Sequence, residues 1–249
     1  MLRSIKDMEG YAVKSGDDGV IGTVHSLLFR DVDWKVRYIV VDTGKWIPGR
    51  RVLVRPGAVK EADGVDQLLR LSMTQEGVER SPDLDDIPPV SRQREIEHRG
   101  VLQSMALWEP AGVPANVYLD PSMAVLLEEG EDVEEAVETD PHLRSTLELE
   151  GYEVHALDGQ IGHVREFIVD TGAVWTLQYA VVNTGTFLTG KDALVHVSWM
   201  TDIDWKASAV RLDLTKKSVE GAPDFDPKEP VNREFEDRLF DYYGRPVYY

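Results

Sequence analysis

The sequence of 249 residues contains no cysteine, which excludes disulfide bonds, thiolate metal sites, iron–sulfur clusters and a cysteine nucleophile. It has no apolar run near the roughly 18 residues of a membrane-spanning helix, so no transmembrane segment is expected. The first residues, Met1 to Asp7, lack the apolar stretch of a secretory signal. These absences fit a reducing compartment, and we expect a cytoplasmic protein.

Basic residues are scarce relative to acidic ones. The chain has 27 lysines and arginines against 45 aspartates and glutamates, which gives a formal net charge of −18. Such a field repels phosphate groups, so we expect no nucleic-acid partner and no attraction to an anionic membrane surface. The charge keeps the protein soluble, and a hydrophobic content of 42% is ample for a folded core.

Motifs that carry chemistry are missing as well. There is no G-x-S-x-G nucleophile turn, no phosphate-binding loop of the form GxxxxGK[ST] and no G-x-G-x-x-G after a strand. A two-residue turn at Asp158-Gly159 would make His155 and His163 diagonal neighbours, but a metal site needs three or four converging ligands. We expect no enzyme, no catalytic residue, no cofactor and no metal, and a small ligand inside a barrel is left open.

The chain repeats itself at one offset. Gly10-Tyr11 recurs as Gly151-Tyr152, 141 residues later, and the segment Val40–Gly44 recurs as Val-Val-Asn-Thr-Gly at 181–185. The offset slips by one residue only at the turn after Val13 and continues to Pro89-Val90-Ser91-Arg92, which matches Pro-Val-Asn-Arg at 230–233. Chance does not maintain one offset over such a length, so we interpret the protein as two copies of one domain.

The repeat predicts three segments, which are a first domain over residues 1–95, a linker over 96–142 and a second domain over 143–249. Residues 128–140 carry eight acidic side chains and no basic one, which is typical of a solvated linker, although an acidic partner-binding segment is an alternative. Residues 96–127 keep several apolar positions and are expected to pack on a domain.

Each copy shows short β-branched and aromatic runs separated by turn signals, which predicts an all-β fold of two small closed barrels. The predicted strands of the first copy are 10–13, 19–24, 34–41, 52–54 and 68–71, with equivalents in the second. Glycines inside strands mark bulges or close backbone approach. The glycines expected at turns, bulges or such approaches are Gly19, Gly22, Gly44, Gly159, Gly162 and Gly185.

A short α-helix is predicted after each barrel, because Ser91 and Asn232 are good N-cap residues before a polar stretch. The second helix is expected to end at Gly244. Exposed aromatic residues are enriched at binding hot spots, although those after the Thr-Gly turn also suit a plug for a barrel end. The candidate partner-binding residues are Trp46, Phe187, Tyr242, Tyr243, Tyr248 and Tyr249.

Four pieces of the sequence together resemble PRC-barrel domain proteins. They are Gly-Tyr-x-Val, Asp-Gly-x-Ile-Gly-x-Val, Arg/Gln-Tyr-x-Val-Val-Asp/Asn-Thr-Gly and the closing Tyr-Tyr-Gly-x-Pro-x-Tyr. The family is named for the cytoplasmic domain of the photosynthetic reaction centre H subunit and includes the C-terminal domain of the ribosome maturation factor. The resemblance covers both copies, and its motifs are structural, so they indicate fold more than function.

The resemblance implies a non-catalytic module that binds proteins, often as a homodimer. We therefore expect a soluble adaptor or assembly protein whose protein partner is unknown, with a homo-oligomer left open. One alternative is a soluble regulator of a membrane electron-transfer complex, like the H subunit, in peripheral contact with that complex. A ribosome-assembly factor is a further alternative, which the acidic charge disfavours. Two barrels on one chain would imitate a family dimer internally.

Overall fold

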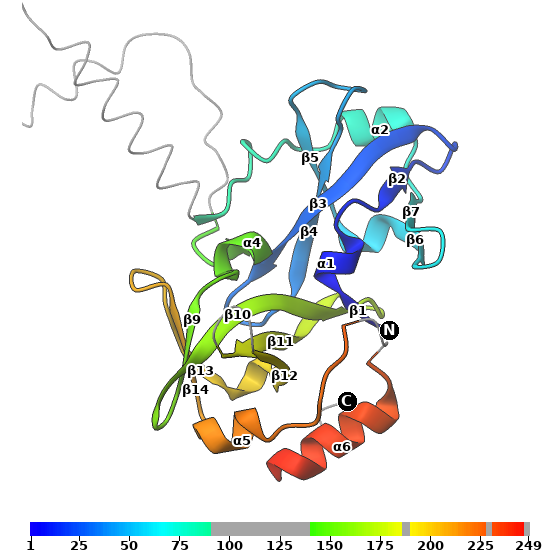
Figure 1. The fold of residues 1–249 in the computed structure, drawn as a ribbon. Helices are drawn as coiled ribbons and strands as arrows, with labels where there is room; N and C mark the ends of the chain where they lie inside the picture. Colours follow the sequence, from blue (N-terminus) through cyan, green and yellow to red (C-terminus); the bar gives the residue numbers. More distant parts are fainter. Residues whose placement is uncertain (91–139, 186–189, 228–230, 247–249) are drawn as a thin grey trace, which may run out of the picture.

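The computed structural model describes residues 1–90, 140–185, 190–227 and 231–246. These residues form two β-rich domains in tandem halves, and each domain is a mixed sheet of seven strands (Figure 1). The first sheet has the order β5-β4-β3-β2-β7-β6 with β8 paired to β3, and the second has the order β12-β11-β10-β9-β14-β13 with β1 paired to β10. The duplication seen in the sequence is therefore a duplication of sheets.

The strands of the two sheets occupy equivalent places along the two halves. Those numbered in the first half are β1 (Leu2–Ser4), β2 (Ala12–Lys14), β3 (Val20–Arg30), β4 (Val36–Asp42), β5 (Arg51–Val54), β6 (Val59–Asp63) and β7 (Leu68–Leu71). Those numbered in the second half are β8 (Leu143–Ser145), β9 (Glu153–Ala156), β10 (Gly159–Asp170), β11 (Thr176–Thr184), β12 (Lys191–His196), β13 (Met200–Asp204) and β14 (Ala209–Leu212).

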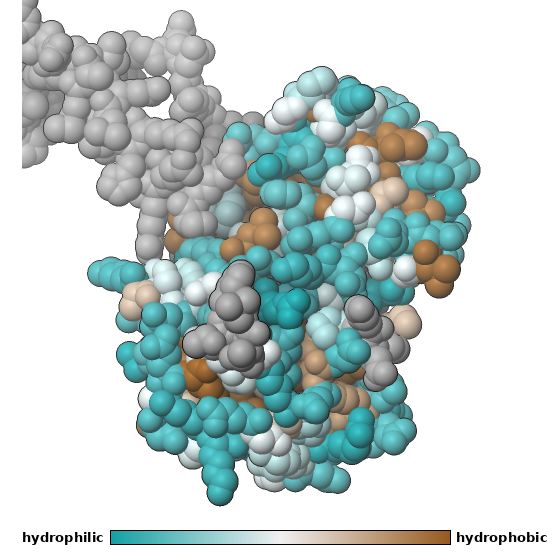
Figure 2. All heavy atoms as spheres, in the orientation of Figure 1, coloured by the Kyte–Doolittle hydropathy of each residue, from teal (hydrophilic) through white to brown (hydrophobic). Residues whose placement is uncertain are grey.

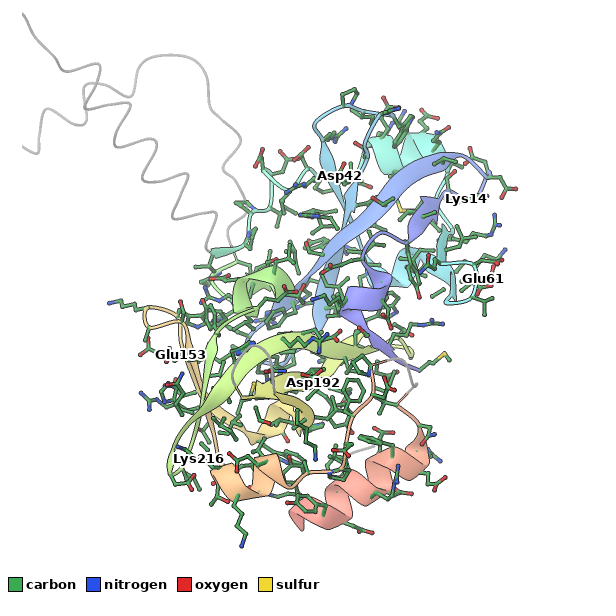
Figure 3. All side chains as sticks on the ribbon, viewed as in Figure 1. Lys14, Asp42, Glu61, Glu153, Asp192 and Lys216 are labelled. Carbon is green, nitrogen blue, oxygen red and sulfur yellow. The ribbon has the colours of Figure 1, made fainter. Side chains whose placement is uncertain are left out.

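The pairing register repeats with the sequence. Leu28 pairs with Tyr38 in the first sheet, and the equivalent Ile168 pairs with Tyr179 in the second. Both ladders shift register at the same two places along the long strand. One polar pair between neighbouring strands keeps its place but changes its residues. In the first sheet the Nε atom of Arg51 lies 3.7 Å from Oδ2 of Asp42, and in the second sheet the equivalent pair is Asp192 and Asn183. Asp42 and Asp192 are labelled in Figure 3.

The ladders do not close into the barrels that the turn spacing predicted. Among the described residues each sheet is a path with two ends, β5 and β6 in the first half and β12 and β13 in the second. The chain passes from one end to the other through a 3-10 turn, η1 (Pro56–Ala58) or η3 (Val197–Trp199). This turn changes the direction of the chain between the two end strands, and no hydrogen-bonded pairing joins those strands in the described part of either sheet.

Three local expectations were wrong. Gly159 pairs with Ala156, so the hairpin turn is Leu157-Asp158 and His155 lies opposite Gln160. The strands β3 and β10 continue six residues beyond the predicted ends, because their second parts pair with segments distant in sequence. Trp34 precedes β4 with a φ of 59°, which ends the strand ladder there.

The helix predicted at the end of the second half is confirmed as α6 (Arg233–Tyr243). The Asn232 side chain accepts a hydrogen bond from the Phe235 amide at 2.9 Å, and Gly244, with a φ of 60°, ends the helix. Three expectations concern residues outside the described ones. They are the helix predicted from Ser91, the packing of residues 96–127 and the acidic run up to residue 139. Short helices that the sequence did not reveal are α1 (Ile5–Met8), α2 (Gln75–Glu79), α4 (Thr146–Leu149) and α5 (Lys216–Glu220).

Gly22 and Gly162 show the close backbone approach predicted for them. A Cβ atom at Gly22 would lie 2.0 Å from the carbonyl oxygen of Asp42, and one at Gly162 would lie 1.8 Å from that of Asn183. Each glycine also adjoins a register shift between the hairpin strands. Neither approach leaves room for a side chain, which explains why both copies have glycine here.

The two halves exchange their first strands. The strand β1 of the first half pairs with β10 of the second, and β8 of the second half pairs with β3 of the first, in the same register. Next to this exchange, the Val36 amide donates to the Trp175 carbonyl and the Leu177 amide donates to the Trp34 carbonyl, both at 2.9 Å. These reciprocal contacts are those of an exchanged dimer within one chain.

The main hydrophobic cluster is continuous across both halves, which differs from two self-contained cores. At the junction Phe167 of the second half lies 6.4 Å from Phe29 and 6.3 Å from Trp34 of the first, measured between ring centroids. A smaller cluster lies on the other face of the first sheet, to which the second half contributes its exchanged strand β8, because alternate residues of a strand face opposite sides. It consists of Leu28, Val40, Leu53, Leu84 and Leu143, with Tyr38 and Ile87 at its edge.

Candidate functional site

The aromatic residues proposed from the sequence lie in different surroundings. Trp46 is half-buried and packs against the main core, as a plug would. Tyr242 is 44% exposed, whereas Tyr243 packs on Trp199 with ring centroids 4.6 Å apart, and this burial raises the pKa of Tyr243. Phe187, Tyr248 and Tyr249 lie outside the described residues. The structure therefore does not bring the proposed residues together into one surface.

Of the glycines proposed as turns, Gly44 adopts a φ of 55° in the turn after β4, and Gly159 a φ of 129° at the start of β10. Gly185 lies in a bend directly after β11. Gly19 directly precedes β3, and a Cβ atom there would lie 2.7 Å from the flexible side chain of Gln75. These glycines shape the scaffold and carry no reactive group.

The helix α6 covers the outer face of the second sheet (Figure 1). Its Phe240 side chain lies between the rings of Tyr179, His196 and Trp199, with centroid distances of 6.4, 5.7 and 5.5 Å. The Tyr179 hydroxyl donates a hydrogen bond of 2.8 Å to the Glu236 carboxylate on the same helix. The sheet face and the helix together form an aromatic seat, which this part-buried hydrogen bond and one of 3.4 Å from the Tyr243 hydroxyl to the Leu194 carbonyl oxygen hold together.

His196 in this seat is neutral. Its Nδ1 atom accepts a hydrogen bond from the Ser198 backbone amide, so Nε2 carries the proton and donates to the Gln178 side chain at 3.2 Å. Burial lowers the pKa of His196 to about 4. The Ser198 hydroxyl lies 2.7 Å from Nδ1, but the ring is oriented by an amide, which gives the pair no resemblance to a catalytic triad.

A pH dependence of stability follows from this burial. The unfolded chain protonates His196 near pH 6.5, whereas the folded chain does so near 4, so the free energy of unfolding falls as the pH drops between these values. We expect wild type to lose about 2 kcal/mol more than a His196→Gln variant between pH 7 and pH 5. Urea unfolding of both proteins at each pH measures the difference, and equal losses would contradict a buried neutral His196.

Carboxylates gather where the exchanged segments meet. Glu166 is 3% exposed, accepts a hydrogen bond from the hydroxyl of Ser4 on β1, and has a raised pKa because of its burial. Burial and the neighbouring Glu150 also raise the pKa of Glu9, with Lys6 acting in the opposite direction. Within the described part of the chain, no group of three potential ligands is placed to hold a metal ion.

An open groove of about 600 Å³ lies on the face of the first sheet that is equivalent to the α6 seat, and second-half residues including Leu143, Val174 and Trp175 form part of its wall. Its lining includes Arg37, Tyr38 and Arg55, whose equivalents in the second half are Gln178, Tyr179 and His196. Tyr179 is 1% exposed beneath α6, whereas Tyr38 is half-buried and both arginines are exposed. No pattern in the sequence predicted this groove, because the groove is defined by long-range packing that differs between the two copies in the described structure.

Comparison with models of known protein families gives no match, and comparison with curated proteins gives none either. No helix among the described residues is long and apolar enough to cross a membrane. The groove of the first half is therefore our candidate functional site on the basis of its geometry alone.

Proposed function

We propose that the protein is a non-catalytic adaptor that binds another protein on an internally duplicated β scaffold, in the manner that its resemblance to PRC-barrel domains implies. The observation that carries this proposal is the unequal covering of two equivalent sheet faces. The face of the second half is covered by α6, and the face of the first half remains a groove within the described structure. Such a concave, partly apolar surface suits a binding partner.

The exchange of β1 and β8 supports a scaffold role. A family dimer would present two equivalent binding faces, but a duplicated chain lets one face change while the other keeps its covering helix. The exchanged strands hold the halves together at a fixed geometry. In this proposal the second half supplies stability, and the first half supplies the surface for a partner.

Affinity capture with the tagged full-length chain in its own native lysate tests this function. We expect one or a few proteins to be recovered in amounts close to that of the bait and to elute with it at a larger mass on size exclusion. Native mass spectrometry of the same preparation looks for small molecules. A chain that elutes alone and carries a stoichiometric organic ligand would overturn the adaptor proposal in favour of ligand binding.

A further inference from the structure

The α6 seat shows what an equivalent sheet face binds. In the second half the bound element is an amphipathic helix whose Phe235, Leu239 and Phe240 face the domain and whose Glu236 accepts a hydrogen bond from the sheet. The sheet contributes Tyr179 to that hydrogen bond. The position of this tyrosine is conserved within the chain as Tyr38, which makes no hydrogen bond through its hydroxyl in the described structure.

The groove of the first half differs from the seat in charge and in aromatic content. Arg55 stands where the second half has the neutral His196, and Arg37 stands where it has Gln178. Neither arginine has an ion-pair partner among the described residues. At the third position the first half has Ala58 in place of Trp199, so it lacks the ring that packs on Phe240 in the seat.

The sequence that follows the first half does not repeat the covering face of α6. At the positions equivalent to Phe235, Leu239 and Phe240 the chain has Arg94, His98 and Arg99. Basic side chains in place of an apolar stripe would meet Arg37 and Arg55 and would leave the apolar floor of the groove uncovered. The sequence equivalent of α6 is therefore unsuited to this face.

We propose that this groove binds an amphipathic helix of a partner protein, with an aromatic face and at least two carboxylates on its flank. The proposal rests on the adaptor function and names the partner by its chemistry. Arg37 and Arg55, which have no ion-pair partner among the described residues, give the groove a basic character on a chain of net charge −18, and the one lining carboxylate, Asp140, is paired with Arg30. The Tyr38 hydroxyl, which makes no hydrogen bond within the described structure, offers a carboxylate the same contact that Tyr179 gives Glu236. Complementary charge then selects acidic helices over neutral ones.

A labelled peptide tests the groove directly. The probe is a fluorescein-labelled peptide of residues 231–245, the sequence of α6, titrated with the full-length chain and read by fluorescence anisotropy. We expect saturable binding that Arg55→Glu weakens at least tenfold, while Arg80→Glu, an equal change of charge on an exposed side chain outside the groove, leaves it unchanged. If Arg55→Glu leaves the peptide affinity unchanged, the peptide binds elsewhere, for example in the seat of the second half after displacing α6, and the proposal is overturned.

A double-mutant cycle tests the carboxylate contact. The peptide with Glu236→Gln is titrated against wild type and against a Tyr38→Phe variant, which keeps the ring and removes only the hydroxyl. We expect the peptide change to weaken binding to wild type and to have little further effect on Tyr38→Phe. Independent effects of the two changes would contradict the predicted contact.

The remaining outcomes separate this proposal from the adaptor function. Concentration-dependent dimerisation abolished by Arg55→Glu, measured by light scattering, would make a second copy the occupant and overturn a foreign partner. Capture of a protein equally by wild type and by the Arg55→Glu chain would retain the adaptor function and overturn the groove as its site. Absence of both peptide binding and captured protein would overturn both.

Discussion

Replacing Gly162 by alanine is expected to lower the free energy of unfolding by about 3 kcal/mol. The added Cβ would lie 1.8 Å from the Asn183 carbonyl oxygen, which belongs to the backbone of the neighbouring strand and has no rotamer to escape into. The strands β10 and β11 must separate or the bulge must be lost. Urea denaturation followed by circular dichroism measures the change.

Two further variants give this prediction its controls. Gly57→Ala introduces the same methyl group where no atom lies within 4 Å, so we expect a change within about 0.5 kcal/mol. Gly22→Ala places the methyl 2.0 Å from the Asp42 carbonyl oxygen in the other half, so we expect a loss similar to that of Gly162→Ala. A Gly162→Ala protein as stable as Gly57→Ala would refute the close approach.

Phe167→Ala is expected to cost about 4 kcal/mol, because it leaves a cavity in the aromatic contact between the halves. Phe167 is 1% exposed and packs on Phe29 and Trp34 of the first half. We therefore expect faster hydrogen exchange in β3 and β4 as well as in β10 and β11, measured by mass spectrometry.

A matched variant distinguishes this effect from ordinary core damage. Phe225 is 9% exposed and packs on Phe235 of α6, within the second half. Phe225→Ala is expected to accelerate exchange in the second half only. If hydrogen exchange in β3 and β4 is as slow in Phe167→Ala as in wild type, the aromatic contact does not couple the two halves.

Much of the scaffold is readable from the sequence because the repeat doubles each local signal. Residue types that favour turns and caps mark the Thr-Gly turns, the glycines inside strands and the N-cap at Asn232. These positions delimit the strands between them, so the strands could be predicted as well. The hairpin at Leu157-Asp158 was misplaced by one residue because Gly159 takes its positive φ inside the strand. Local composition cannot distinguish these two registers.

The exchange of strands is not readable from the sequence for a different reason. The segments 2–4 and 143–145 are both Leu-Arg-Ser, so each matches its own sheet and the other sheet equally well. The choice is made by the long strands β3 and β10, whose second parts extend into the other half. The groove depends on long-range packing too, since among the described residues a helix covers this face in the second copy and none does in the first.

The two halves form one interleaved unit, because each contributes a strand to the sheet of the other. A specific protease site inserted after Gly112, outside the described residues, allows the chain to be cut between them, and size exclusion with light scattering follows the products. We predict that the cut chains elute together as one complex and melt in a single cooperative transition, because β1 and β8 remain paired across the halves. Separation without denaturant into two fragments, each with its own cooperative transition, would show that the halves are independent and not interleaved.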